Sequence, residues 1–276
     1  MSVKLSARVK HLLTLRNPNP TPAPNLVKLR AVFDATSNAA RLHKAERGWL
    51  ALATATLLST NSPDSVAHLY RYASKSKDSL LDLPERVNTA AFMRESALKS
   101  SIFVGVAMTI NSLAALHGAL ESDVKEHLRK DPLRDANRDN INTFLARGHA
   151  LWKSIYEPHA DKLQNKLGSY HPDFPLFILQ AYGVVLAPLS PSEQGNVSRA
   201  LTSVVGISCL RAMQGVGPQL ISHVFGLLKA RGVEGESEGD RWLSSDEGTV
   251  WVIETVDKIC DVVRENDASD AVQTKL

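Results

Sequence analysis

Residues 201–230 read LTSVVGISCLRAMQGVGPQLISHVFGLLKA, two apolar segments of helical length on either side of the turn Gly215-Val216-Gly217-Pro218. Proline lacks an amide hydrogen and ends a helix, but its fixed φ angle suits the first turn of the next one. This stretch therefore predicts one helix that ends at Met213 and a second over residues 218–231. A pair of helices joined by such a tight turn favours an all-α fold.

The same alternation of apolar helical segments and breakers extends along most of the chain. Ser62-Pro63 and Ser190-Pro191 each place a serine at an N-cap and a proline at the first helical position, and Glu193 completes a capping box with Ser190. No segment alternates as a strand would over more than a few residues. An all-α bundle and an all-α repeat solenoid both agree with this pattern. Further helices are expected over residues 27–42, 49–59, 63–73, 84–102, 107–120, 137–156, 193–213 and 246–264.

Composition excludes several classes of protein. The chain has 276 residues, of which 43% are hydrophobic and 22% charged, as in an ordinary globular protein. Disorder along the whole chain, a collagen-like repeat and a disulfide scaffold are therefore excluded. No run approaches the roughly 18 apolar residues that a transmembrane helix requires.

The net charge of +3 comes from the N-terminal end of the chain. Residues 1–33 hold six lysines and arginines and no acid, so the remainder has 26 basic against 29 acidic residues. The remainder shows neither a basic stripe nor a nucleic-acid-binding motif, and we expect no nucleic-acid partner.

The first 25 residues have a distinct character. Residues 1–16, MSVKLSARVKHLLTLR, alternate apolar and basic residues, which is typical of a mitochondrial transit peptide. A basic first helix or a disordered tail fits equally well, and the location would then be cytoplasmic. Residues 17–25, NPNPTPAPN, cannot continue a helix and are expected to form a linker.

The two cysteines, Cys209 and Cys260, are 51 positions apart and form no CxxC motif. This spacing excludes a cysteine-rich zinc site and favours two structural thiols in a reducing compartment. The histidines show no HxxxH or HExxH spacing, and no phosphate-binding loop is present. The sequence therefore indicates neither a metal site nor a cofactor.

A short pattern occurs twice. Residues 63–70, PDSVAHLY, and residues 218–225, PQLISHVF, each have a proline followed five positions later by a histidine, an aliphatic residue and an aromatic residue. Each follows a helix rich in small and aliphatic residues. The pattern places His68 and His223 on the second turn of a helix, and it suggests an internal duplication.

Three blocks carry a resemblance to a known family: residues 93–116, residues 171–188 and residues 201–230. Together they resemble a fungal group of alkylhydroperoxidase D-like proteins in the carboxymuconolactone decarboxylase superfamily, which is often described as mitochondrial and of unknown role. The resemblance implies an all-α fold of two divergent tandem units and a homo-oligomer. It divides the chain into a basic and proline-rich segment (1–25), a first unit (26–120), connecting helices (121–190), a second unit (191–266) and a polar tail (267–276).

The chain departs from the family at the redox motif. The redox branch has CxxCxxxH on a helix, but the two cysteine positions fall on Val216 and Gln219 before His223, and on Asn61 and Asp64 before His68. A thiol peroxidase needs a thiolate nucleophile and a resolving thiol. We therefore expect no thiol peroxidase activity, and the resemblance implies a degenerate active site.

The decarboxylase branch does not need the cysteine pair, because a positioned base and a group that stabilises an enolate suffice. On this reading His223, His68 and Glu95 are the candidate catalytic residues. The alternative is that both histidines are buried structural groups and that Glu95 forms an ion pair between helices. Gln219, at a former cysteine position, and Gly217 in the turn are candidate ligand contacts, although both could serve only to shape the turn.

Two functions stay open. The first is a redox-inactive helical protein that binds a small molecule or a protein partner, and the absence of all four cysteines favours it. The second is a cysteine-independent enzyme that resembles carboxymuconolactone decarboxylase and uses a histidine base. In either case the resemblance implies a small organic acid or a lactone as the ligand.

Overall fold

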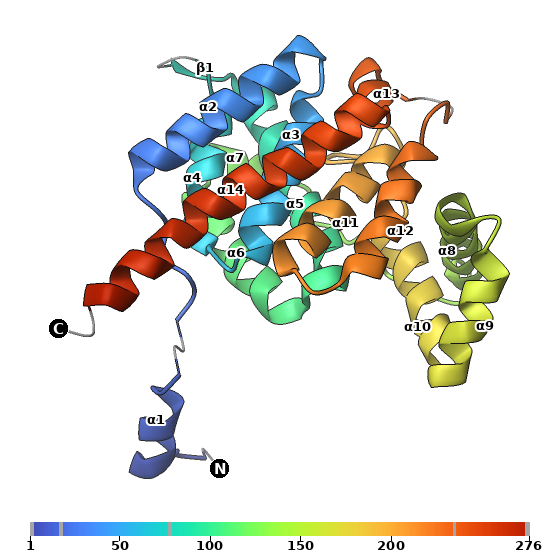
Figure 1. The fold of residues 1–276 in the computed structure, drawn as a ribbon, viewed down its shortest axis with the longest axis horizontal. Helices are drawn as coiled ribbons and strands as arrows, with labels where there is room; N and C mark the ends of the chain where they lie inside the picture. The colour runs from blue at the N-terminus through green and yellow to red at the C-terminus, as the bar shows by residue number, and fades with distance from the viewer. Residues whose placement is uncertain (1–2, 17–18, 77–78, 234–235, 274–276) are drawn as a thin grey trace.

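The computed structural model describes residues 3–16, 19–76, 79–233 and 236–273, and most of them are helical (Figure 1). The all-α class predicted from the sequence is thus confirmed. In chain order the elements are α1 (Ala7–Leu13), α2 (Leu26–Leu42), α3 (Glu46–Ser59), α4 (Pro63–Ala73), β1 (Lys75–Ser76), β2 (Ser79–Leu80), α5 (Leu83–Val104), α6 (Val106–Ala119), α7 (Ser122–His127), α8 (Ile141–Tyr156), α9 (Ala160–Tyr170), α10 (Phe174–Ala181), the π-helix η1 (Tyr182–Leu186), α11 (Arg199–Met213), α12 (Gly217–Leu228), α13 (Glu238–Leu243) and α14 (Asp246–Gln273). The antiparallel pair β1–β2 was not expected from the sequence.

The main body is built around α3 and α11, which pack against each other and are buried along almost their whole length. The long helix α14 lies across them beside α2, and α5 with α6 closes another side (Figure 1). One hydrophobic core takes residues from both halves of the chain, for example Leu52 and Met93 from the first and Val204 and Val256 from the second. The two predicted units therefore share a core, and the structure gives no support to tandem units with separate cores.

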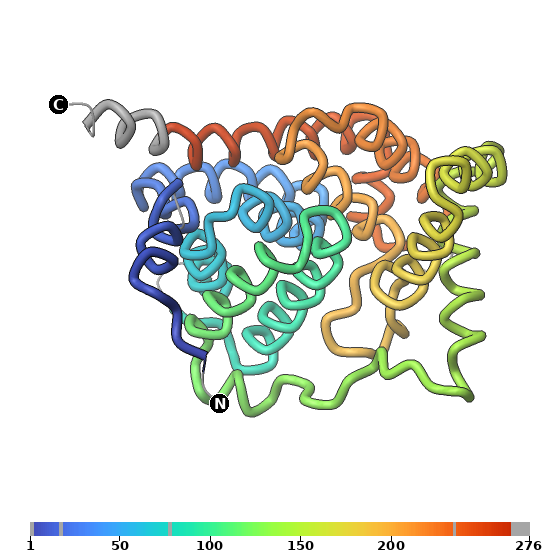
Figure 2. The backbone as a smooth tube through the Cα atoms, turned by 90° about the horizontal axis from the view of Figure 1, so that it is seen from below, coloured from blue at the N-terminus to red at the C-terminus, as the bar shows by residue number. Residues whose placement is uncertain are grey.

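A smaller lobe of α8, α9, α10 and η1 projects from one end of the body, and an extended segment after α7 leads to it (Figure 2). It has its own core, which includes Leu151, Trp152, Ile155, Leu179 and Tyr182. This lobe lies within the segment that the sequence predicts only as connecting helices.

The start of α11 differs from the prediction. Ser190 and Pro191 lie in a turn, and α11 begins at Arg199, where the hydroxyl of Ser198 accepts a hydrogen bond from the amide of Leu201 (3.2 Å). Gly195 explains the difference, because it has a φ of +79° and lies against the carbonyl of Ala91 too closely for a Cβ atom. The chain must turn there and cannot continue as a helix.

The N-terminal helix α1 buries no residue and lies apart from the body (Figure 1). Its apolar residues Val9, Leu12 and Leu13 are exposed together with its basic ones. In the described part of the chain, no helix is both long enough and apolar enough to cross a bilayer.

The repeated pattern produces the same local structure twice. Pro63 opens α4 after α3, and Pro218 lies in the first turn of α12 after α11. The two environments differ: His68 on α4 is half-buried, whereas His223 on α12 is 5% exposed. Local sequence alone therefore does not give the two histidines equivalent roles.

Candidate functional site

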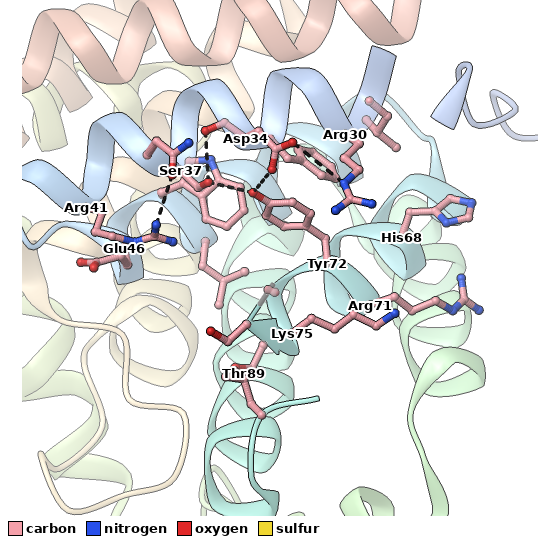
Figure 3. Close-up of a pocket in the computed structure, with 18 of the residues that line it drawn as sticks. Arg30, Asp34, Ser37, Arg41, Glu46, His68, Arg71, Tyr72, Lys75 and Thr89 are labelled. Atoms are coloured by element: carbon pink, nitrogen blue, oxygen red, sulfur yellow. Dashed lines mark hydrogen bonds and ion pairs between the residues drawn. The ribbon is translucent and has the colours of Figure 1, made fainter. Parts of the chain in front are cut away.

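A groove of about 1100 Å³ runs between α2, α3, α4 and the start of α5 (Figure 3). Its floor is aromatic: the rings of Phe33 and Trp49 meet edge to face, and the ring of Tyr72 packs against both. Hydrogen bonds hold this floor in place. The indole of Trp49 donates to the hydroxyl of Thr36 (2.8 Å), and the phenol of Tyr72 donates to the carboxylate of Asp34 (2.7 Å).

One end of the groove is basic. Figure 3 shows Arg30, His68, Arg71 and Lys75 around it, contributed by α2, α4 and β1. Of these basic residues, and within the described part of the chain, only Arg30 faces a carboxylate of the groove, that of Asp34, at a long 3.9 Å. The acids that line the groove are Asp34, Glu46 and Glu85. Because Asp34 supplies one negative charge against those of Arg30, Arg71 and Lys75, the basic end is left with an excess of positive charge.

His68 is the one predicted site residue that lines this groove. Burial, and then the charge of Arg71, lower the pKa of its imidazole, while Asp64 acts in the opposite direction. A pKa below 6.5 leaves the ring mostly neutral at pH 7. Arg71 lies one helical turn beyond His68 and shares its face of α4, and this spacing of three residues is the signal by which the sequence could have revealed it.

His223 lies elsewhere, between α11, α5 and α8. Its ring meets the edge of Phe103 at 5.1 Å between centroids, and a Cβ atom at Gly206 would come within 2.7 Å of Nδ1. Within the described residues, Nδ1 has no hydrogen-bond partner. Burial, followed by the charge of Arg199, lowers the pKa of His223 to about 4. His223 and His68 thus have different surroundings and do not form one site.

We expect the His223 imidazole to stay neutral in the folded protein down to about pH 4, against 6.5 for an unperturbed ring. Between these values the unfolded chain binds more protons than the folded chain. The free energy of unfolding should therefore fall as the pH drops from 6.5 toward 4. An NMR pH titration, assigned with the His223→Asn variant, measures the ring directly. A midpoint near 6.5 would contradict the assignment of His223 as a buried structural group.

Glu95 belongs to a buried charged cluster. Its carboxylate accepts a hydrogen bond from the guanidinium of Arg134 and lies 3.7 Å from the ammonium of Lys99. Lys99 is fully buried and donates to the carbonyls of Val185, Leu186 and Ala187 at 2.5–3.2 Å. The structure does not pair Glu95 with either histidine. The sequence left an ion pair between helices as the alternative; the partners observed are Arg134, in the loop between α7 and α8, and Lys99, on α5 itself.

The two candidate ligand contacts lie at the surface. Gln219 and Gly217 are exposed at the start of α12 and do not line the groove.

The two cysteines, Cys209 and Cys260, are buried, and burial raises the pKa of each thiol to about 11. Neither thiol is available as a thiolate at neutral pH.

Comparisons with family models, with curated protein sequences and with solved structures find no match to this chain. Among the residues that the structure describes, no three histidine, cysteine, aspartate or glutamate side chains come together as metal ligands. In the groove beside His68, a predicted site residue meets an open cavity.

Proposed function

We propose that this protein is a redox-inactive binding protein that holds a small organic acid in the groove between α2 and α4. The observation that carries the proposal is the pairing of an aromatic floor with a basic end that its own acids do not neutralise. The half-buried ring of Tyr72 offers apolar surface, with the buried rings of Phe33 and Trp49 behind it. Arg71 and Lys75 offer charge to a carboxylate. This combination of an apolar lining with a few convergent polar groups is typical of small-molecule sites.

The state of the other candidate groups supports binding over redox catalysis. Both thiols are buried with raised pKa values, and the carboxylate of Glu95 is occupied by Arg134. His223 has a pKa near 4 and is a weak base. These three observations count against the two thiols as nucleophiles and against two of the three candidate bases that the sequence indicates, Glu95 and His223.

A second candidate is a cysteine-independent enzyme that acts on a lactone acid, with His68 as the base. One observation favours it: the His68 ring is half-buried, lines the groove and has a lowered pKa, so that it is able to accept a proton at neutral pH. Arg71 would then stabilise the developing enolate charge.

The proposal extends to the family of this chain. A divergent alkylhydroperoxidase D-like protein without the cysteine pair would agree with the all-α fold and the inaccessible thiols.

The proposal also covers the oligomeric state and the location in the cell. Exposed apolar residues on α10 and α12 would suit a homo-oligomer; among them are Phe177, Ile221 and Phe225. Light scattering at increasing protein concentration tests this. The exposed basic and apolar helix α1 would suit mitochondrial import, which imaging of a fluorescent fusion with and without residues 1–25 tests.

Calorimetric titration with phenylacetate tests the groove. We expect binding that the double variant Arg71→Gln/Lys75→Gln weakens about tenfold, because charge-assisted hydrogen bonds are lost. The exposed Lys153→Gln on α8 is the matched control and should leave the affinity unchanged. Equal affinities in all three proteins would overturn the proposal.

The enzymatic candidate needs a separate measurement. Incubation with a γ-lactone carboxylic acid, followed by chromatography of the products, should show turnover that His68→Asn abolishes while binding persists. Binding without turnover in the unmodified protein would leave the binding function and reject the enzyme.

A further inference from the structure

A second cavity, of about 540 Å³, lies between α5, α6 and α7 and shares no residue with the groove at His68. Its apolar wall consists of leucines, three of which are almost fully buried. They are Leu113, Leu116, Leu120 and Leu128. A cavity of this size lies within the range of small-molecule sites.

All the other residues that line this cavity are basic: Arg94, His117, Lys125, Arg129 and Lys130. No acidic residue lines it. The acids nearest in sequence are engaged elsewhere, since Glu121 accepts from the phenol of Tyr70 (2.6 Å) and Asp123 from Arg86 (2.7 Å). The two exposed acids of this segment, Glu126 and Asp131, do not line the cavity.

Arg94 is the residue that distinguishes this cavity from an ordinary basic surface. Its side chain projects from the middle of α5 and is half-buried. Among the described residues, its guanidinium has neither a hydrogen bond nor an ion pair, and the nearest charge acting on it is that of Arg129, of the same sign. Burial and this like charge lower the pKa of Arg94. A half-buried cation without a counter-ion is unfavourable, and an anion placed in the cavity would relieve it.

Arg129 is held beside Arg94 by the loop that follows α7. Its amide donates to the side-chain carbonyl of Gln194 (2.9 Å), and its guanidinium donates to the carbonyl of Asp131. Neither partner is a carboxylate, so the positive charge of Arg129 is not neutralised. Two guanidiniums without a carboxylate partner among the described residues therefore lie at the edge of a leucine-lined cavity.

We propose that this cavity binds an amphiphile with a single anionic head group and an aliphatic body, its head between Arg94 and Arg129 and its body against the leucines. The two guanidiniums of the site suit the anionic head group, and its leucines suit the aliphatic body. Guanidinium groups bind carboxylate and phosphate in a bidentate manner, and leucine side chains gain free energy from contact with aliphatic carbon.

Calorimetric titration of the full chain with decanoate below its micelle concentration tests this proposal. We expect saturable binding that Arg94→Gln weakens about tenfold or more. Decanol, which lacks the charge, and acetate, which lacks the chain, should each bind at least tenfold more weakly than decanoate. Decyl phosphate distinguishes a phosphate from a carboxylate head, and tighter binding of either compound supports the amphiphile and identifies its head group.

Two further variants keep the test independent of folding and of a general loss of positive charge. Arg129→Gln removes the second guanidinium, on the loop after α7, and should weaken decanoate binding in a protein with an unchanged melting temperature. Lys153→Gln removes an exposed charge on α8, outside both cavities, and should leave decanoate binding unchanged. Decanol binding as tight as decanoate, or affinity unaffected by both Arg94→Gln and Arg129→Gln, would overturn the proposal.

Discussion

Glu95→Ala is expected to lower the free energy of unfolding by about 3–5 kcal/mol, the largest effect of any side-chain truncation that we foresee. Glu95 is 4% exposed and is the anion in a cluster that also holds Lys99 and Arg134. Its removal leaves the buried ammonium of Lys99 and the partly buried guanidinium of Arg134 without a counter-charge. Urea denaturation followed by circular dichroism measures the loss.

The charged cluster of Glu95, Lys99 and Arg134 lies next to backbone carbonyl groups that need hydrogen-bond donors. The π-helix η1 ends in carbonyl groups that have no partner within the helix, and basic side chains satisfy them. Arg134 donates to the carbonyl of Val184 (2.6 Å), Lys99 donates to the next three carbonyls, and Arg147 donates to that of Pro188 (2.5 Å). Glu95 offsets the positive charge that this arrangement concentrates inside the protein.

A second substitution separates lost charge balance from lost packing. Glu95→Gln keeps the size of the side chain but removes its charge, so it should lose most of the stability that Glu95→Ala loses. If Glu95→Gln is instead as stable as the unmodified protein, the charge argument fails. A Glu95→Ala protein as stable as the unmodified one would also contradict it.

Gly183→Ala is expected to destabilise the protein by about 3 kcal/mol or more, because α8 and η1 cross at backbone contact. A Cβ atom at Gly183 would lie 1.9 Å from the carbonyl oxygen of Phe144, and one at Gly148 would lie 2.1 Å from that of Leu179. These contacts are made by backbone atoms, which cannot move aside as a flexible side chain can. Loss of this crossing would open the core of the small lobe around Trp152 and Tyr182.

Gly118→Ala is the matched control. It lies in α6 with nothing within 4 Å of a new Cβ atom, so alanine should be neutral or should stabilise the helix by up to about 1 kcal/mol. Thermal and urea unfolding of the two variants, followed by the tryptophan fluorescence of the lobe, compare them directly. Similar stabilities for both variants would show that the α8–η1 crossing tolerates a side chain.

Helix positions in the main body were predictable from local signals. Pro63 opens α4, Gly105 separates α5 from α6 with a φ of +86°, and Ser245 caps α14 by accepting from the amide of Gly248 (3.0 Å). These signals act within a few residues, so the sequence contains them directly. The predicted helix start at Ser190 was wrong because the opposing determinant, the contact of Gly195 with α5, is not local.

The candidate site was less predictable. His68 was identified from a pattern, but Arg30 reaches the same groove from a separate helix about 40 residues earlier in the chain. The partners of Glu95 were also hidden, because Arg134 lies 39 residues away and has no periodic relation to it. Pairings of this kind follow from packing, which local spacing does not reveal.

The sequence by itself determined the all-α class, most of the helix ends in the main body and the absence of a CxxC redox pair, but it did not predict α9, α10 or η1 of the small lobe. The features that it determined depend on backbone sterics, capping and residue identity, each of which acts locally. Only the tertiary structure decided that the two halves share one core, that His223 is buried while His68 lines a groove, and that Arg94 has no counter-ion. The physical reason is that burial and charge neutralisation depend on which distant segments pack together, and two similar local patterns can meet different neighbours.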